Sequence, residues 1–305
     1  MRYIEFLDSF KPTEGGIHIP FVSGRWYMLL SALENKYIRE LPVHGLSLNN
    51  TDRDEKIIVS LTSFPARIDS VGYAIKSLFH QTVKADRIIL WLSEEQFPDR
   101  KLPALLRDLI KHGLEVEFCQ DDLRAHKKYY YSLKNQKSSE LVITYDDDLI
   151  YPENSIELLI KKHLEFPDCI ICNRAQCPSV TGDKYNPYNK WKVFSNEGVK
   201  TPSKKLFPST GGGTLYPYGT VNEEAFNIQD MKKLAFSADD LWMRYMSALN
   251  KTAIIKTKKR HKIFSVIGDS QGESLQVVNC LNGGNDKAIE LLNEAFPQVR
   301  EYMFE

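Results

Sequence analysis

From residue 56 onward, short apolar runs alternate with segments that have the residue spacing of helices. β-Branched runs predict buried strands at 57–62, 87–92, 114–118 and 141–144. Between these runs, the spacing predicts helices at 71–79, 103–112 and 129–137. Because this βαβα order favours a mostly parallel sheet with helices on both faces, we expect an α/β, Rossmann-type fold.

The two ends of the chain are less regular. Residues 1–54 close with a polar run at 49–54 and are expected to form an N-terminal extension of uncertain structure. Residues 181–208 are rich in Asn, Lys, Pro and aromatic side chains, which predicts long loops. We therefore expect a single domain over 55–305, with a regular first half and a loop-rich second half.

Composition limits the kinds of partner and the cellular compartment that we expect for this chain. Lys and Arg together number 40, as do Asp and Glu, so the chain has no global field to attract nucleic acid, and no nucleic-acid partner is expected. Five cysteines without regular spacing indicate reduced thiols in a cytoplasmic setting. The N-terminus has no apolar signal core. An apolar stretch at 26–30 predicts a helix packed on the main domain, and a peripheral contact with the inner face of the plasma membrane stays open.

Three adjacent carboxylates, Asp146, Asp147 and Asp148, directly follow the predicted strand at 141–144. Such groups repel one another unless a cation or a proton offsets the repulsion. The carboxyl end of a strand is where open α/β sheets bind ligands. We expect Asp146 and Asp148 to face one way and to bind Mn²⁺ or Mg²⁺, with Asp147 turned toward a ribose or a lysine. The alternative is an acidic turn that caps the next helix.

Two polar loops are further candidates for ligand contacts. Thr62, Ser63 and Arg67 follow the first strand, where hydroxyls and a guanidinium could reach a phosphate or a base. The alternative is an ordinary proline turn. Lys127 and Lys128 stand just before a predicted helix and suit a diphosphate, although a solvated charged loop explains them as well.

The second half contributes three more candidates. The glycine run at 211–213 permits close approach of the backbone to a ligand, or forms a flexible turn. Asp239 and Asp240 stand at a predicted helix start, where one could act as a general base or both could simply cap the helix. His261, within a basic run, is a candidate metal ligand or part of a solvated loop.

Taken together, these stretches from residue 56 onward resemble bacterial family-two-like glycosyltransferases of surface polysaccharide biosynthesis, which have the GT-A fold. The resemblance implies a nucleotide-binding half at 55–150 and an acceptor-binding half at 151–305. It implies that Asp146 and Asp148 form the DXD motif for the divalent ion and the donor diphosphate, with Asp148 as the direct ligand. Asp239 and Asp240 match the family's acidic pair, with Asp in place of Glu, and Asp240 would be the base. His261 matches a C-terminal metal ligand.

The implied reaction is transfer of a sugar, with inversion, from a UDP-sugar or other nucleotide-sugar donor to a saccharide or lipid-linked saccharide acceptor. Two other functions remain in view. A haloacid-dehalogenase-type phosphohydrolase would use Asp146 as nucleophile and Asp148 as acid. A non-catalytic carbohydrate-binding protein would stack Tyr185, Tyr188 and Trp191 on sugar rings.

Overall fold

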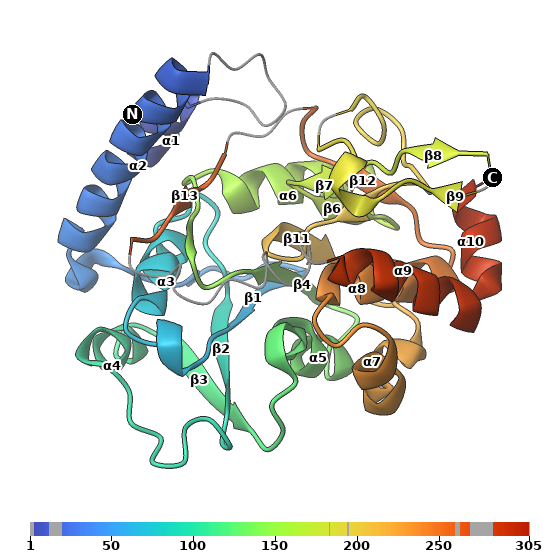
Figure 1. Ribbon diagram of the computed structural model, residues 1–305. Coiled ribbons are helices and arrows are strands. Elements are labelled where there is room, and N and C mark those ends of the chain that lie inside the picture. Colours follow the sequence, from blue (N-terminus) through green and yellow to red (C-terminus); the bar gives the residue numbers. More distant parts are fainter. Residues whose placement is uncertain are drawn as a thin grey trace.

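The fold is organised around a seven-stranded sheet, which a computed structural model shows for this chain (Figure 1). The structure describes residues 3–11, 20–182, 184–193, 195–259, 263–268 and 283–304. The strand order is β12-β6-β11-β4-β1-β2-β3. These strands are β1 (Lys56–Thr62), β2 (Arg87–Ser93), β3 (Leu114–Cys119), β4 (Glu140–Tyr145), β6 (Ile170–Cys172), β11 (Gly212–Tyr216) and β12 (Ile254–Lys256).

The helices form layers on both faces of this sheet. The described helices are α1 (Tyr3–Ser9), α2 (Pro20–Glu40), α3 (Val71–Phe79), α4 (Ala104–Ile110), α5 (Lys127–Lys134), α6 (Ser155–Glu165), α7 (Ile228–Leu234), α8 (Asp239–Leu249), α9 (Gly284–Ala295) and α10 (Pro297–Phe304). One buried cluster joins the sheet to α3, α4 and α6, and another joins it to α5, α8, α9 and α10. The expected α/β architecture, a mostly parallel sheet flanked by helices, is therefore confirmed.

Alternate side chains of β1 pack against the helix layers on opposite faces of the sheet. Ile57, Val59 and Leu61 belong to the cluster with α3, whereas Ile58 belongs to the cluster with α5. Successive side chains of a strand point to opposite faces, so a strand covered on both sides must be apolar nearly throughout. This requirement explains why the strands of the sheet appear in the sequence as nearly continuous apolar runs.

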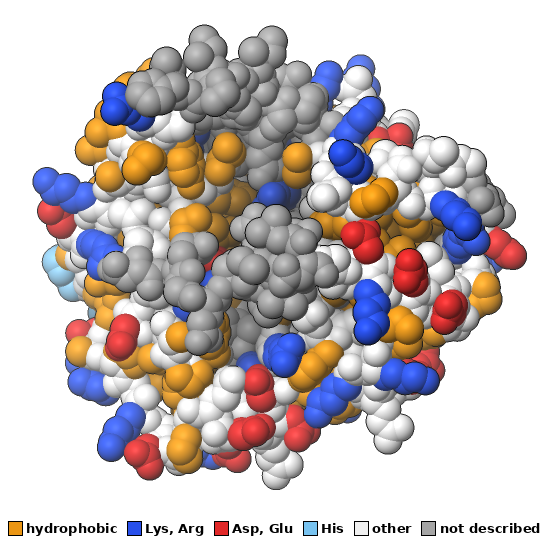
Figure 2. All heavy atoms as spheres, viewed as in Figure 1, with side chains coloured by type: hydrophobic (Ala, Val, Ile, Leu, Met, Phe, Trp, Pro, Cys, Tyr) orange, Lys and Arg blue, Asp and Glu red, His pale blue; other side chains and the backbone are white. Residues whose placement is uncertain are grey.

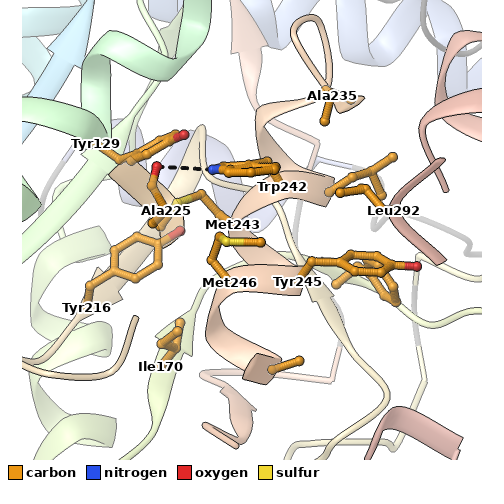
Figure 3. Packing of buried hydrophobic residues seen from close by; sticks show 14 of the residues in the cluster. Tyr129, Ile170, Tyr216, Ala225, Ala235, Trp242, Met243, Tyr245, Met246 and Leu292 are labelled. Atoms are coloured by element: carbon orange, nitrogen blue, oxygen red, sulfur yellow. Dashed lines mark hydrogen bonds between the residues drawn. The ribbon is translucent and has the colours of Figure 1, made fainter. Parts of the chain in front are cut away.

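The layer built on α8 forms the core of the second half. Trp242 is fully buried, and its indole N–H donates a hydrogen bond to the carbonyl of Ala225 at 3.1 Å (Figure 3). Tyr129 from α5 and Tyr216 from β11 lie in the same cluster. α8 is thus packed firmly against the sheet, which fixes the position of its first residues.

One strand of the sheet runs against the others. β11 pairs antiparallel with β4 on one side and with β6 on the other, while all other pairs in this sheet are parallel. Since β11 is reversed, its beginning lies beside the end of β4, and Gly212 is the partner of Tyr145. The glycine run, expected to be a turn or a ligand loop, therefore starts a buried central strand.

The remaining strands are short and lie mostly in the loop-rich second half. They are β5 (Leu149–Ile150), β7 (Ala175–Gln176), β8 (Val180–Thr181), β9 (Lys184–Tyr185), β10 (Phe207–Pro208) and β13 (Ser265–Val266). β13 pairs with β5, directly after the acid cluster. The loop-rich character expected for the second half is confirmed.

The N-terminal segment contains two helices that pack on the sheet domain. Glu153 accepts hydrogen bonds from the backbone N–H groups of Ile4 and Glu5, at 2.9 and 2.6 Å, and so satisfies free donors at the start of α1. α2 contacts α3, β5 and β13. The helix expected around 26–30 is part of α2. No helix in the described part of the chain is long and apolar enough to cross a bilayer.

We predict that Gly213→Ala destabilises the protein by at least about 2 kcal/mol, measured by urea unfolding. Gly213 has φ of +89°, and an added Cβ would lie 2.7 Å from Asn173 Nδ2 and 2.9 Å from a ring carbon of Tyr145. The left-handed backbone conformation and the overpacking each cost on the order of 1 kcal/mol or more.

Gly219→Ala is the matched control for this prediction. Gly219 also has positive φ, +75°, but an added Cβ would meet no atom within 4 Å. The Gly219→Ala variant should therefore lose only about 1 kcal/mol of stability, from the backbone conformation alone. Equal losses in the two variants would show that the space around Gly213 is not the constraint.

Candidate active site

The two acidic clusters of the sequence meet around one buried lysine. Nζ of Lys128 lies 2.7 Å from Oδ1 of Asp146 and 2.8 Å from Oδ2 of Asp239. Asp146 follows β4, Asp239 begins α8, and Lys128 lies in the first turn of α5. Three segments far apart in the sequence therefore converge at the carboxyl end of β4, where open α/β sheets bind ligands.

Arg67 forms ion pairs with the other two of the three consecutive carboxylates. Its Nη1 lies 2.8 Å from Oδ1 of Asp147 and 3.0 Å from Oδ2 of Asp148. Ser63 donates a hydrogen bond to Oδ2 of Asp147 at 2.6 Å. Two of the three predicted residues after β1 thus bind the acid cluster itself, and Asp147 is turned toward Arg67.

Thr62 and Lys127, which were expected to contact the ligand, form their hydrogen bonds outside the acid cluster. The hydroxyl of Thr62 donates to the carbonyl of Trp91 in β2 at 2.7 Å. Lys127 is buried against Asp122, on the other side of the turn that begins α5. For Lys127 the reason is the start of α5, which lies two residues earlier than expected. Residues 127 and 128 are therefore successive residues of a helix and point in different directions.

Thr210 ties the acid pair of α8 to the start of β11. Its backbone N–H donates to Oδ1 of Asp240 at 2.7 Å. Its hydroxyl lies 2.6 Å from both Oδ2 of Asp239 and Oδ1 of Asp240. In the sequence, only the place of Thr210 directly before the glycine run could have pointed to this role.

Gly211 provides the space for the carboxylate of Asp146. A Cβ at position 211 would lie 1.7 Å from Oδ2 of Asp146, so any other residue would displace that carboxylate. The backbone N–H of Asp146 lies 3.2 Å from the Gly211 carbonyl, which also accepts a hydrogen bond from the Tyr151 hydroxyl at 2.7 Å. Close backbone approach was expected for the glycine run, and here it admits a side chain of the protein itself.

Burial and charge divide the acid pair of α8 into two different groups. Burial alone would raise the pKa of Asp239, but Lys128, His126 and hydrogen bonds from Lys128 and Thr210 lower it to about 2. Burial, followed by the charge of Asp239, raises the pKa of Asp240 to about 6. Two neighbouring carboxyls with pKa values moved apart in this way suit a permanent anion and a proton acceptor near neutral pH.

In the described part of the chain, the cluster holds more acid than base. Its five carboxyls are those of Asp146, Asp147, Asp148, Asp239 and Asp240, and the described cations in contact with them are Arg67 and Lys128. Burial, followed by the charge of Asp146, raises the pKa of Asp148 to about 7. The electrostatic surroundings of the three consecutive acids therefore favour a further cation.

The carboxylates of the cluster suit a divalent ion that is also bound by phosphate oxygens of a substrate. Within the described ranges, no three His, Cys, Asp or Glu side chains form a ready-made metal cage. Mg²⁺, however, is usually held by one or two carboxylates together with waters and substrate phosphates. Asp146, whose side chain is 40% exposed, and Asp148 could supply those carboxylates. His261 lies outside the described residues.

The aromatic side chains of the second half are used in packing. Trp191 is buried and lies 4.7 Å, ring centre to ring centre, from Phe207, and Tyr185 and Tyr188 pack against it at 5.4 and 4.8 Å. The alternative in which Trp191 stacks on a sugar ring is therefore wrong, because this ring belongs to the core.

Comparisons with known proteins give only distant similarity. No protein-family model and no curated protein matches the sequence. Solved structures with some likeness include a 2-C-methyl-D-erythritol 4-phosphate cytidylyltransferase of Francisella tularensis, at 13% identity and a TM-score of 0.41, covering 69% of this chain and 94% of that one. S. aureus TarS 1–349 has 13% identity and a TM-score of 0.40, covering 68% and 59% of the two chains. Similarity at this level says nothing about what this chain does.

We predict that Lys128→Met destabilises the protein by about 3 kcal/mol at pH 7, measured by urea unfolding. The substitution leaves Asp239 buried without its cation, and breaking a buried ion pair costs about 3–5 kcal/mol. We expect the lower end of this range because Asp146, the other partner of Lys128, is partly exposed and can be hydrated when its cation is lost. The deficit should shrink as the pH falls toward 4, since protonation of Asp239 removes the unpaired charge.

Lys161→Met is the matched control for Lys128→Met. Lys161 is 68% exposed and pairs with Glu157 at 2.6 Å, so its loss should cost no more than about 0.5 kcal/mol at any pH. A Lys128 deficit as small as this, or one that does not change with pH, would contradict a buried charge at the centre of the site.

Proposed function

We propose that the protein is a metal-dependent glycosyltransferase that moves a sugar from a nucleotide-sugar donor, a UDP-sugar in the first instance, to a saccharide or lipid-linked saccharide. The observation that carries this proposal is the contact of Lys128 with both Asp146 and Asp239. This contact joins the carboxylates after β4 to the acid pair of α8, and we propose that the first group binds a metal and a diphosphate and that the second supplies the carboxyl for proton transfer. A transferase of this kind needs both in one site.

The acids after β4 would bind the donor. Asp146 and Asp148 would hold Mn²⁺ or Mg²⁺, which, when bound, neutralises the leaving diphosphate and acts as a Lewis acid. Arg67 and Ser63 fix Asp147, and Arg67 also holds Asp148. In this proposal Lys128 orients Asp146 through their ion pair and adds positive charge near the diphosphate. Residues 55–150 would thus supply the donor half of the site.

Asp240 would be the general base. It is half-buried, its raised pKa suits proton transfer near neutral pH, and Thr210 fixes one of its oxygens. It would take the proton from an acceptor hydroxyl as that oxygen attacks the anomeric carbon and the bond to the diphosphate breaks, with inversion. Asp239 would stay ionised and hold Lys128 in place. Residues 151–305 would supply this acceptor half.

Asp240→Asn should lower kcat by about 10²–10⁴-fold and leave donor affinity unchanged, because the amide cannot accept the proton but can still accept the hydrogen bond from Thr210. For the wild type, kcat/KM should rise with pH through about 6, the pKa of Asp240, and then level off. In the variant this rise should vanish. The measurement is sugar transfer to an acceptor across pH 5–8.

Asp239→Asn is the matched comparison for the general base. Its carboxylate pairs with Lys128, so this variant should lose stability, whereas Asp240→Asn should not. Unchanged transfer rates in Asp240→Asn would remove Asp240 from the mechanism.

Asp148→Ala should weaken manganese-dependent binding of UDP by at least about tenfold, measured by titration calorimetry. Chelation of the metal should abolish the difference between this variant and the wild type. Asp121→Ala, an exposed acid in the loop after β3, is the control and should bind as the wild type does. Undiminished affinity in Asp148→Ala would contradict the metal assignment.

A thermal-shift screen of nucleotide sugars would identify the donor, because ligands that bind the native state raise its apparent stability. The proposal expects a shift that requires manganese and is lost on chelation. A panel without any metal-dependent shift would count against the proposed class of reaction.

A further inference from the structure

Exposed hydrophobic side chains are concentrated on the two N-terminal helices. Among the described residues ten large hydrophobic side chains are exposed, and six of them fall within residues 3–29: Tyr3, Phe6, Phe10, Trp26, Met28 and Leu29. We call these six the α1–α2 patch. Phe6 and Phe10 are in ring contact at 5.1 Å, and the indole N–H of Trp26 donates to the carbonyl of Phe10 at 3.1 Å, so the patch spans both helices.

The outward face of α2 combines apolar side chains with cations. Exposed residues recur at the spacing of a single helix face: Arg25, Met28, Leu29, Ala32, Lys36 and Arg39. The opposite face carries Leu30, Glu34 and Ile38, which are buried. Glu34 faces inward, where it pairs with Lys11 at 2.6 Å. Figure 2 shows the result, hydrophobic side chains with Lys and Arg beside them in the region where Figure 1 places α2.

Large apolar side chains in the middle of an outward helix face are unusual for a protein surface in water. Met28 is 69% exposed and Leu29 50%, although both lie near the middle of the face that points away from the domain. Exposed apolar side chains gathered on one surface commonly mark a site of interaction. Trp and Phe together with Lys and Arg are the residues of helices that lie in the headgroup region of a membrane.

The cations on α2 help to decide whether a second copy of the chain or a lipid surface covers the α1–α2 patch. In a two-fold dimer the same patch lies on both partners, which would bring the cations around Met28 and Leu29 of each copy close to one another. An anionic lipid surface instead attracts Arg25, Lys36 and Arg39 while the apolar side chains enter the headgroup region. Glu40, also exposed, lies 3.9 Å from Lys36 and offsets part of this charge.

We propose that the α1–α2 patch docks the protein peripherally on an anionic lipid bilayer. Other residues of α2, outside the patch, connect this helix to the segment after the acid site through hydrogen bonds. Tyr27 donates to the carbonyl of Phe264 at 2.9 Å and Asn35 to that of Val266 at 2.9 Å, while the N–H of Ile267 donates to the carbonyl of Asp148 at 2.8 Å. Docking would therefore hold the acid cluster close to the bilayer, where a lipid-linked acceptor would be found.

The test is flotation of the full chain with vesicles of phosphatidylcholine alone or mixed with phosphatidylglycerol. The wild type should float with the anionic vesicles, far less with the neutral ones, and less as the salt concentration rises. Met28→Gln with Leu29→Gln should weaken this binding at least about tenfold, since both positions lose their apolar contact. Arg25→Gln with Lys36→Gln should remove the preference for anionic vesicles.

Leu164→Gln is the matched control. Leu164 is 74% exposed on α6, outside the patch, so this variant should bind vesicles as the wild type does. All these substitutions replace exposed residues, and unchanged circular dichroism and urea midpoints would confirm that the fold is kept. The assay needs no transfer activity, so its outcome is independent of the proposed reaction.

Three results would overturn the proposal. The first is a wild-type chain that does not float with anionic vesicles. The second is equal binding by the Met28/Leu29 variant and the wild type. The third is a dimer in analytical ultracentrifugation that dissociates in this variant, which would show that a second copy of the chain covers the patch.

Discussion

The site depends on one buried ammonium group between two carboxylates. Burial alone would lower the pKa of Lys128, but the charges of Asp146, Asp239 and Asp240 raise it well above its ordinary value, so the lysine stays charged. A buried cation of this kind requires its partners, and they require it. Because Asp146 follows β4 and Asp239 begins α8, this single contact fixes the distance between the two halves of the chain at the point where the proposed chemistry takes place.

The reversed strand β11 makes that contact possible. A parallel strand beside β4 would end at the site, whereas β11 begins there and brings Thr210 and Gly211 against the acids. Thr210 binds the pair at the start of α8, and Gly211 leaves room for Asp146. The sheet therefore shapes the acid cluster directly, through the direction of one strand and the missing side chain of one residue.

Local sequence patterns predicted the regular part of the fold well. The expected strands at 57–62, 87–92, 114–118 and 141–144 correspond to β1 to β4, because each is apolar, short and bounded by turn residues. Gly212–Tyr216 escaped this reasoning, since glycines carry no apolar pattern and favour turns in isolation. Lys127 and Lys128 looked equivalent in the sequence, but the first turn of α5 separates them, one toward Asp122 and one toward Asp146.

The sequence by itself determined the order of strands and helices and the places where carboxylates and cations are concentrated, because both are local properties of the chain. Only the tertiary structure decided which of these groups touch. Arg67 reaches Asp147 and Asp148 across about eighty residues, and Thr210 reaches Asp239 and Asp240 across about thirty. Such pairings follow from strand order and strand direction, which depend on how whole layers pack and leave no mark on the residues nearby.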